Sequence, residues 1–220
     1  MHAAVPPEPF PPPNSTRLAR RLRDGALEKA EPIASSNQGC VYRLAFDDRQ
    51  LAIKTPRGRG ATGLINRAGL QREFRAYQRL QGLQGFPRCL GLIDKRWLVL
   101  DFVAATPFRQ AHVEPSFFDE LLATIRAMHQ RGVAHGDLKR KANLLVAETG
   151  KPVILDFGTA IIERQGFHPI KTRLFNYMRQ TDLNAWVKLK YGGYAGVSVE
   201  DSGLLKRSRL ERVMVHFRKT

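Results

Sequence analysis

The chain has 220 residues, 43% of them hydrophobic, and a formal net charge of +16. This length favours one compact unit with a sizeable core, and the two cysteines, Cys40 and Cys89, exclude a disulfide framework or a cysteine-based metal site. We therefore expect a protein of a reducing compartment, the cytoplasm, and no apolar run is long enough to cross a bilayer.

The N-terminal segment is rich in proline, with Pro6-Pro7 and Pro11-Pro12-Pro13 close together. Because proline breaks helices, the composition predicts a flexible, polyproline-like arm over residues 1–16. A short basic helix over residues 17–27 is expected to lead from this arm into the first part of the fold.

A polar turn from Ser35 to Tyr42 lies between two strand-like segments and contains a single glycine. Backbone N–H groups of such a turn can cap phosphates, and the hydroxyls of Ser35 and Ser36 can donate to them. Ser35, Ser36 and Gly39 are therefore candidate phosphate-binding residues, although a plain hairpin turn explains the same pattern.

Two further segments place a lysine and a glutamate beside apolar residues. Lys54 ends a strand-like run that begins at Leu51. Leu70, Phe74 and Tyr77 recur at the spacing of one helical face, which predicts an amphipathic helix that carries Glu73 at its flank.

An apolar strand is expected from Trp97 to Val103, followed by a longer helix. The apolar stripe of that helix consists of Phe118, Leu121, Leu122, Ile125 and Met128. It delivers the chain to a loop that begins at His135.

Two loops each present one carboxylate beside an apolar run, Asp137 in His-Gly-Asp-Leu-Lys and Asp156 in Ile-Leu-Asp-Phe-Gly. Such a pair suits phosphoryl transfer, because one acid can orient a hydroxyl and accept its proton while the other holds magnesium against the nucleotide phosphates. With Lys54 and Glu73 upstream in the order a kinase needs, residues 33–190 resemble the protein-kinase-like superfamily.

The resemblance implies an α+β fold with two lobes, together with ATP and Mg²⁺ as cofactors. Residues 17–103 would form an N-lobe and hinge, with an antiparallel sheet and one main helix. Residues 104–220 would form a shortened, mostly helical C-lobe. The stretch from Lys206 to Thr220 carries apolar residues on one side, which predicts a basic amphipathic helix packed on this lobe, with a membrane-surface role as the alternative.

The resemblance also implies roles in nucleotide binding. Lys54, steadied by Glu73, would bind the α- and β-phosphates. The backbone carbonyl of Asp101 and the backbone N–H of Val103 would face the adenine edge, and Leu100 would line the back of its pocket.

Further roles concern the transferred phosphoryl group. Asp137 would act on the acceptor hydroxyl, Asp156 would hold magnesium, and Lys139 would offset charge in the transition state unless it belongs only to a basic patch. His135 would pack beneath the loop. Asp182 would begin a helix and hold the loop by hydrogen bonds, with a role as helix N-cap as the alternative.

Two residues depart from the pattern of common kinases. Gly136 stands where they have arginine, so we expect no control by activation-loop phosphorylation, and His-Gly-Asp is similar to the RIO kinases and the lipopolysaccharide core kinases. The usual metal-binding asparagine position holds Ala142, and the asparagine follows as Asn143. Asn143 would still hold magnesium if the loop bulges; otherwise it only closes a turn.

Little chain separates Gly158 from Asp182, and no Ala-Pro-Glu signature lies between them, so the usual platform for a peptide substrate is expected to be missing. Three hypotheses stay open: an atypical serine/threonine protein kinase, a lipopolysaccharide core sugar kinase at the inner membrane face, and a catalytically silent module that binds RNA or a partner.

The positive charge is uneven along the chain. Residues 54–80 carry seven Lys or Arg against one Glu, and residues 171–220 carry eleven against four acids. Such surfaces attract polyanions, and we rank an anionic membrane surface or an anionic substrate above nucleic acid, because aromatic residues do not interleave with the basic ones. The sequence predicts no oligomeric state.

Overall fold

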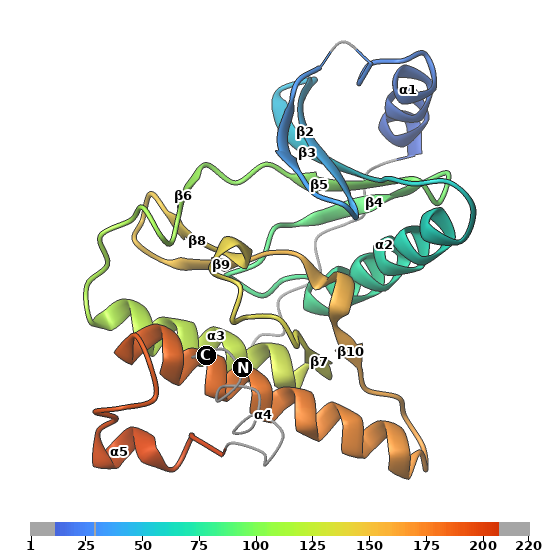
Figure 1. Cartoon of the computed structure of the whole chain (residues 1–220). Helices are drawn as coiled ribbons and strands as arrows, with labels where there is room; N and C mark the ends of the chain where they lie inside the picture. The colour runs from blue at the N-terminus through green and yellow to red at the C-terminus, as the bar shows by residue number, and fades with distance from the viewer. Residues whose placement is uncertain (1–11, 29, 207–220) are drawn as a thin grey trace.

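An antiparallel sheet of five strands forms the first lobe of the computed structural model, in which residues 12–28 and 30–206 are described. The strand order is β1 (Pro32–Ser35), β2 (Gly39–Phe46), β3 (Arg49–Pro56), β5 (Trp97–Asp101) and β4 (Cys89–Ile93) (Figure 1). Side chains alternate between the two faces of a strand. In β5, Trp97 and Val99 therefore join one core cluster while Leu98 and Leu100 join another.

Helices cover both faces of this sheet. Helix α1 (Pro12–Arg23) packs Leu18 and Leu22 into the cluster of Trp97 and Val99. Helix α2 (Gly60–Leu80) lies on the other face, with Leu98 and Leu100 in its cluster. Burial on both faces explains why β5 reads as a continuous apolar run rather than an alternating one.

Helix α1 begins earlier than the sequence suggests. Pro12 starts it, so the expected boundary between arm and helix at residue 16 is wrong, and residues 1–11 lie outside the described part of the chain. Proline is well accommodated in the first helical turn, where its fixed φ suits the helix and its missing N–H is not needed. The helix ends at Arg23 rather than residue 27, and Gly25 follows with a φ of +84° in a turn.

The second lobe contains most of the remaining helix. Its elements are β6 (Ala105–Pro107), α3 (Ser116–Gln130), β7 (Val133–Ala134), the 3₁₀ turn η1 (Lys141–Asn143), β8 (Leu144–Ala147), β9 (Pro152–Ile154), η2 (Phe157–Thr159), β10 (Ile161–Ile162), α4 (Pro169–Tyr191) and α5 (Val199–Ser202). Strands β6, β8 and β9 form one small sheet, and β7 pairs with β10 in another.

One core cluster joins the two lobes. It extends from Tyr77 of α2 through Phe157 to Ile125 of α3 and Trp186 of α4, all of which are fully buried or nearly so. The Phe157 ring lies 5.0 Å from the Tyr77 ring and 4.9 Å from the ring of His135. Burial of an aromatic or branched side chain contributes about 1.5–3 kcal/mol. The expected α+β fold with an N-terminal sheet is confirmed.

The chain beyond α5 is held against α4. The side-chain amide of Asn184 donates to the Lys206 carbonyl at 3.0 Å and accepts from the Lys206 N–H at 3.0 Å. The expected basic helix lies, from residue 207 onward, outside the described residues. Within residues 12–28 and 30–206, no helix combines the length and apolar character that crossing a membrane requires.

Candidate active site

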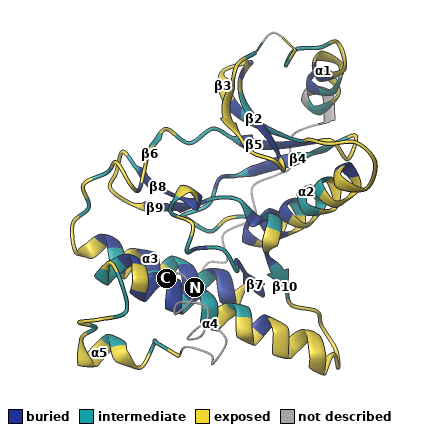
Figure 2. Ribbon diagram, in the orientation of Figure 1, coloured by how far each residue is buried: buried dark blue, intermediate teal, exposed yellow. Residues whose placement is uncertain are grey.

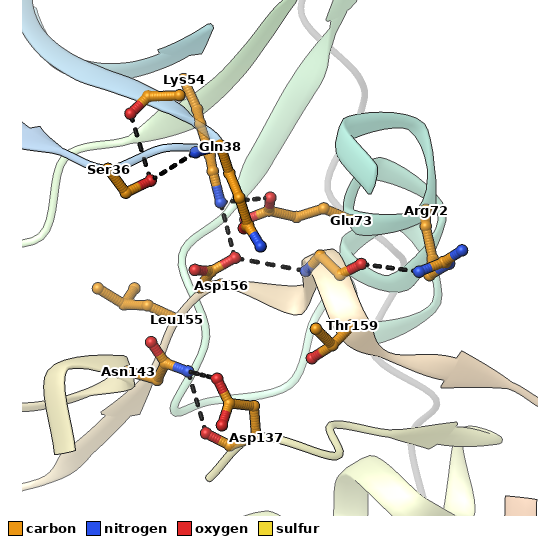
Figure 3. A network of polar contacts seen from close by, with 12 residues as sticks. Ser36, Gln38, Lys54, Arg72, Glu73, Asp137, Asn143, Leu155, Asp156 and Thr159 are labelled. Carbon is orange, nitrogen blue, oxygen red and sulfur yellow. Dashed lines mark hydrogen bonds and ion pairs between the residues drawn. The ribbon is translucent and has the colours of Figure 1, made fainter. Parts of the chain in front are cut away.

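Lys54 lies between two carboxylates that come from distant parts of the chain. Its Nζ donates to Glu73 Oε2 at 2.6 Å and to Asp156 Oδ1 at 2.8 Å (Figure 3). The Glu73 side chain is 2% exposed, that of Lys54 is 17% exposed and that of Asp156 is 32% exposed. The lysine, the helix glutamate and one loop aspartate thus form a single cluster that opens toward solvent on the Asp156 side.

Strand and helix periodicity place the first two members of this cluster. Lys54 is opposite Leu98 in the register of β3 and β5, so it shares the face that α2 covers. Along α2, Leu70, Glu73 and Tyr77 all lie on the buried face. The sequence predicted Glu73 at the flank of the apolar face, but it lies on the buried face itself. Phe74, in contrast, is only partly buried.

Burial and charge together set the protonation of the cluster. Burial alone lowers the pKa of the Lys54 ammonium, but the two carboxylates outweigh it and the pKa is raised. Burial raises the pKa of the Glu73 carboxyl above its ordinary range, and Lys54 offsets this only in part. For Asp156 burial also acts upward, but Lys54 outweighs it and holds the pKa below the ordinary value. A charged lysine beside an ionised Asp156 is the state that binds phosphate and a cation.

Asp156 has an unusual backbone conformation. Its φ of 64° and ψ of 75° lie in the left-handed region, which costs energy in a residue other than glycine. The buried ring of Phe157 anchors the segment, and the Gly158 N–H donates to Asp156 Oδ1 at 3.4 Å. The core thus holds the carboxylate in a strained position facing Lys54.

The second loop brings Asp137 next to Asn143. The Asn143 amide donates to the Asp137 carbonyl at 3.0 Å and to Asp137 Oδ2 at 3.4 Å, and Asn143 is 4% exposed. Asn143 lies one position later than the asparagine of common kinases. A turn in which the Arg140 N–H donates to the Asp137 carbonyl, followed by the 3₁₀ turn η1, accommodates this additional residue. The loop therefore bulges as the magnesium hypothesis requires.

The donor set of this site fits a magnesium ion. Figure 3 shows the Asn143 amide oxygen turned away from Asp137, on the side of Asp156. A carboxylate and an amide oxygen are hard donors, which Mg²⁺ prefers, and Mg²⁺ commonly uses only one or two protein ligands together with substrate phosphates. No group of three or more His, Cys, Asp or Glu side chains could hold a metal in the part of the chain that the structure describes.

Asp182 binds the backbone of the loop that carries Asp137. It is fully buried, its Oδ2 accepts from the His135 N–H at 2.8 Å, and its Oδ1 accepts from the Gly136 N–H at 2.8 Å. The ring of His129 lies 3.0 Å from Oδ2. The sequence predicted Asp182 at the start of a helix, but it lies well inside α4, so both that position and the N-cap alternative are wrong.

His135 links the two loops that carry the acids. Its Nε2 lies 2.8 Å from the Leu155 carbonyl, and the Asp137 N–H donates to Nδ1 at 3.2 Å. A neutral ring protonated on Nε2 satisfies both contacts. The hydroxyl of Thr159 donates to the His135 carbonyl at 3.2 Å, so this fully buried histidine connects the residues next to Asp137 and Asp156.

Gly136 has a structural reason to be glycine. Its φ is +78°, and a Cβ at this position would lie 3.2 Å from the sulfur of Met178 in α4. An arginine here would be strained and crowded. The expected absence of control by activation-loop phosphorylation stays a prediction.

The hydroxyls of the candidate phosphate loop hold the hairpin itself. Ser36 Oγ accepts from the Gln38 N–H at 3.2 Å, and Ser35 Oγ accepts from the Arg57 guanidinium at 3.1 Å. A Cβ on Gly39 would lie 2.2 Å from the Thr55 carbonyl oxygen, so only glycine allows β2 to approach β3 here. A hairpin turn accounts for these contacts, and the phosphate-binding roles of the two serines and Gly39 stay predictions.

Two side chains at the site, Gln38 and Arg72, were not predicted from the sequence. Gln38 extends from the hairpin toward Lys54 and Asp156 in Figure 3. The Arg72 guanidinium donates to the Gly158 carbonyl at 2.9 Å and thereby ties α2 to the loop that carries Asp156. Neither belongs to a motif; only the polar character of the hairpin pointed to Gln38.

The remaining predicted residues lie around this cluster. Asp101 ends β5, its N–H donates to the Arg88 carbonyl at 2.9 Å, and Val103 follows just beyond the strand. Leu100 is buried in the core. Lys139 is partly exposed in the loop after Asp137. The adenine-binding and phosphoryl-stabilising roles of these residues stay predictions.

Comparisons with known proteins agree with this geometry. The RIO domain family model matches residues 48–175, more than half of the chain, a stretch that includes Lys54, Asp137 and Asp156. The crystal structure of the Rio2 kinase from Chaetomium thermophilum is similar, with a TM-score of 0.60 and 18% sequence identity. The similarity covers 90% of this chain and 71% of that chain, and at this sequence identity it shows the fold alone. A search of curated proteins found no match. The chain belongs to the RIO domain family of atypical kinases.

Proposed function

We propose that this protein transfers the γ-phosphate of ATP, in a magnesium-dependent reaction, to a serine or threonine hydroxyl of a protein. The observation that carries the proposal is the contact of Lys54 with both Glu73 and Asp156, in a structure where the loop of Asp137 is tied to the loop of Asp156 through His135. A buried ion pair is weak evidence for stability alone. Its direct contact with Asp156, whose loop is tied through His135 to the loop of Asp137, favours a catalytic purpose.

Each residue has a distinct role in this proposal. Lys54, positioned by Glu73, binds the α- and β-phosphates, while Asp156 and Asn143 hold magnesium, which neutralises charge on the phosphates. Asp137 orients the acceptor hydroxyl and accepts its proton. Lys139, two residues further along the same loop, lowers the barrier by offsetting charge on the transferred group.

A second acceptor, a sugar hydroxyl of lipopolysaccharide core at the inner membrane face, is favoured by one observation. Strand β10 ends at Ile162 and α4 begins at Pro169, which leaves only a short connection where an extended peptide would otherwise be bound. A protein acceptor would therefore present a folded surface rather than an extended segment. The third hypothesis, a silent module, is disfavoured because Lys54, Asp137 and Asp156 are all retained.

The acceptor can be identified with labelled nucleotide. Purified protein is incubated with γ-labelled ATP and magnesium, in parallel with cell protein and with extracted lipopolysaccharide, and phosphoamino acids are analysed. We expect label on serine or threonine that is lost in Asp137→Ala and retained in Asp201→Asn, a matched acid variant in α5. Label in lipopolysaccharide instead would establish the sugar acceptor, and no Asp137-dependent label in either fraction would contradict both proposals.

A further inference from the structure

The N-terminal half of α4 and the residues just before it expose large apolar side chains. Phe167 is 93% exposed, Ile170 is 84% exposed, and Leu174 and Tyr177 are 44% and 45% exposed. Isolated apolar side chains on a surface need no explanation, but a contiguous group of them marks an interaction site.

Three of these side chains form a single stripe on α4, and Phe167 precedes the helix. Ile170, Leu174 and Tyr177 follow the spacing i, i+4, i+7, so they lie on one face of α4. A different face packs into the protein, through the buried Phe175 and Asp182. The stripe is therefore a second apolar face of the helix, and it contributes nothing to the core.

The stripe is surrounded by positive charge. Arg164, Lys171, Arg173 and Arg179 are all exposed, and residues 164–181 contain no acidic residue. The spacing of Lys171 and Arg173 places them on either side of the stripe. An apolar face bordered by cations is complementary to a surface that is apolar inside and anionic outside.

The shape of this region favours a bilayer over a peptide. In Figure 1 the N-terminal half of α4 extends past α3 and the β7–β10 pair, and Figure 2 shows it largely exposed. Peptide and small-molecule sites are usually grooves, whereas a projecting helix with aromatic and branched side chains can enter the headgroup region of a membrane. We propose that this face of α4, residues 167–179, docks the protein on an anionic lipid bilayer.

This docking is independent of phosphoryl transfer, but it concerns the helix that supports the catalytic loop. Asp182 of α4 binds the backbone of His135 and Gly136, and Met178 faces Gly136. A lipid-bound α4 would therefore hold the catalytic loop close to the membrane surface.

The test is flotation of the full-length protein with vesicles of phosphatidylcholine alone and with vesicles containing about 30% phosphatidylglycerol. We expect binding only to the anionic vesicles, weakened by added salt because screening shortens the reach of the cations. The double variant Phe167→Ser/Ile170→Ser is expected to bind at least about tenfold more weakly, since two apolar side chains no longer enter the bilayer. The variant Lys171→Gln/Arg173→Gln is expected to lose about thirtyfold.

Matched controls separate this face from general effects. Val199 is 92% exposed on α5, beside Glu200 and Asp201, and Val199→Ser should not change binding. The pair Lys95→Gln/Lys151→Gln removes the same charge from two other exposed positions and should reduce binding much less than the α4 pair.

Three results would overturn the proposal. The first is equal binding to neutral and anionic vesicles, and the second is equal losses in the α4 and control variants. The third is that the wild-type protein binds a mixed-sequence single-stranded RNA but no vesicles, and that the α4 variants no longer bind the RNA. This result would assign the face to nucleic acid. The melting temperature of each variant is measured as a control, and a value equal to that of the wild type would show that the exposed substitutions leave the fold intact.

Discussion

The carboxylate of Asp182 supplies the clearest quantitative test of how the catalytic loop is supported. Substitution by asparagine keeps the shape of the side chain but replaces one acceptor oxygen with a donor. The amide oxygen can still accept the Gly136 N–H, but the amide nitrogen then faces both the His135 N–H and the His129 ring. The His135 N–H therefore loses its acceptor in a fully buried place.

The cost follows from these contacts. An unsatisfied buried donor costs about 1–3 kcal/mol, and exchanging a charged acceptor for a neutral one in the remaining bond removes about 1 kcal/mol more. We therefore expect Asp182→Asn to lower the free energy of unfolding by about 2–4 kcal/mol. Because the substitution leaves Lys54 and Asp156 in place, phosphate transfer should fall while nucleotide affinity stays near that of the wild type.

Urea unfolding measures the loss, with an unchanged slope against denaturant as the sign that the unfolding reaction is the same. Asp201→Asn is the matched control, because Asp201 binds Lys190 at 2.7 Å in a partly exposed pair, and its loss should stay below about 1 kcal/mol. Equal losses in the two variants, or a transfer rate that Asp182→Asn does not change, would refute the assigned role.

Two further predictions concern the first lobe. In Lys54→Met the buried Glu73 loses its cation. Because burial raises the pKa of Glu73, the folded state takes up a proton at higher pH than the unfolded state, so the melting temperature of the variant should approach that of the wild type between pH 8 and pH 5. An equal difference in melting temperature at both pH values would contradict this. Gly39→Ala forces a Cβ to within 2.2 Å of the Thr55 carbonyl and should cost about 1–3 kcal/mol by chemical denaturation, whereas Gly193→Ala, which meets nothing within 4 Å, should be nearly neutral.

The residues that the structure brings together in the candidate site could be predicted from the sequence because their signals are local. Each of Lys54, Asp137 and Asp156 follows a short apolar run, and Glu73 lies in a helix whose apolar spacing is regular. The depth of Glu73 was not predictable, since a charged residue is normally expected at the edge of a buried face. The direct contact with the Lys54 ammonium offsets part of the cost of burying Glu73, whereas the second carboxylate, Asp156, adds to that cost.

Helix boundaries were the weakest predictions, for two physical reasons. Helix α4 begins at Pro169, well before the start predicted at Asp182. The prediction was wrong because the exposed apolar stripe adds a second apolar face to the sequence pattern and obscures the periodicity of the buried face. Helix α1 begins at Pro12 because proline, unfavourable inside a helix, is accepted in its first turn. The position of Gln38 beside Lys54 and Asp156 depends on how the hairpin folds, which no local sequence pattern reports.

The most direct test of the site is the melting temperature of the purified protein with and without ATP and magnesium. A ligand that binds only the folded state raises this temperature. We expect an increase in the wild type, its loss in Lys54→Ala and in Asp156→Ala, and its retention in Lys151→Ala, which removes an exposed lysine from the β8–β9 connection. No increase in the wild type, or an increase of the same size in all three variants, would contradict a nucleotide site built on Lys54 and Asp156.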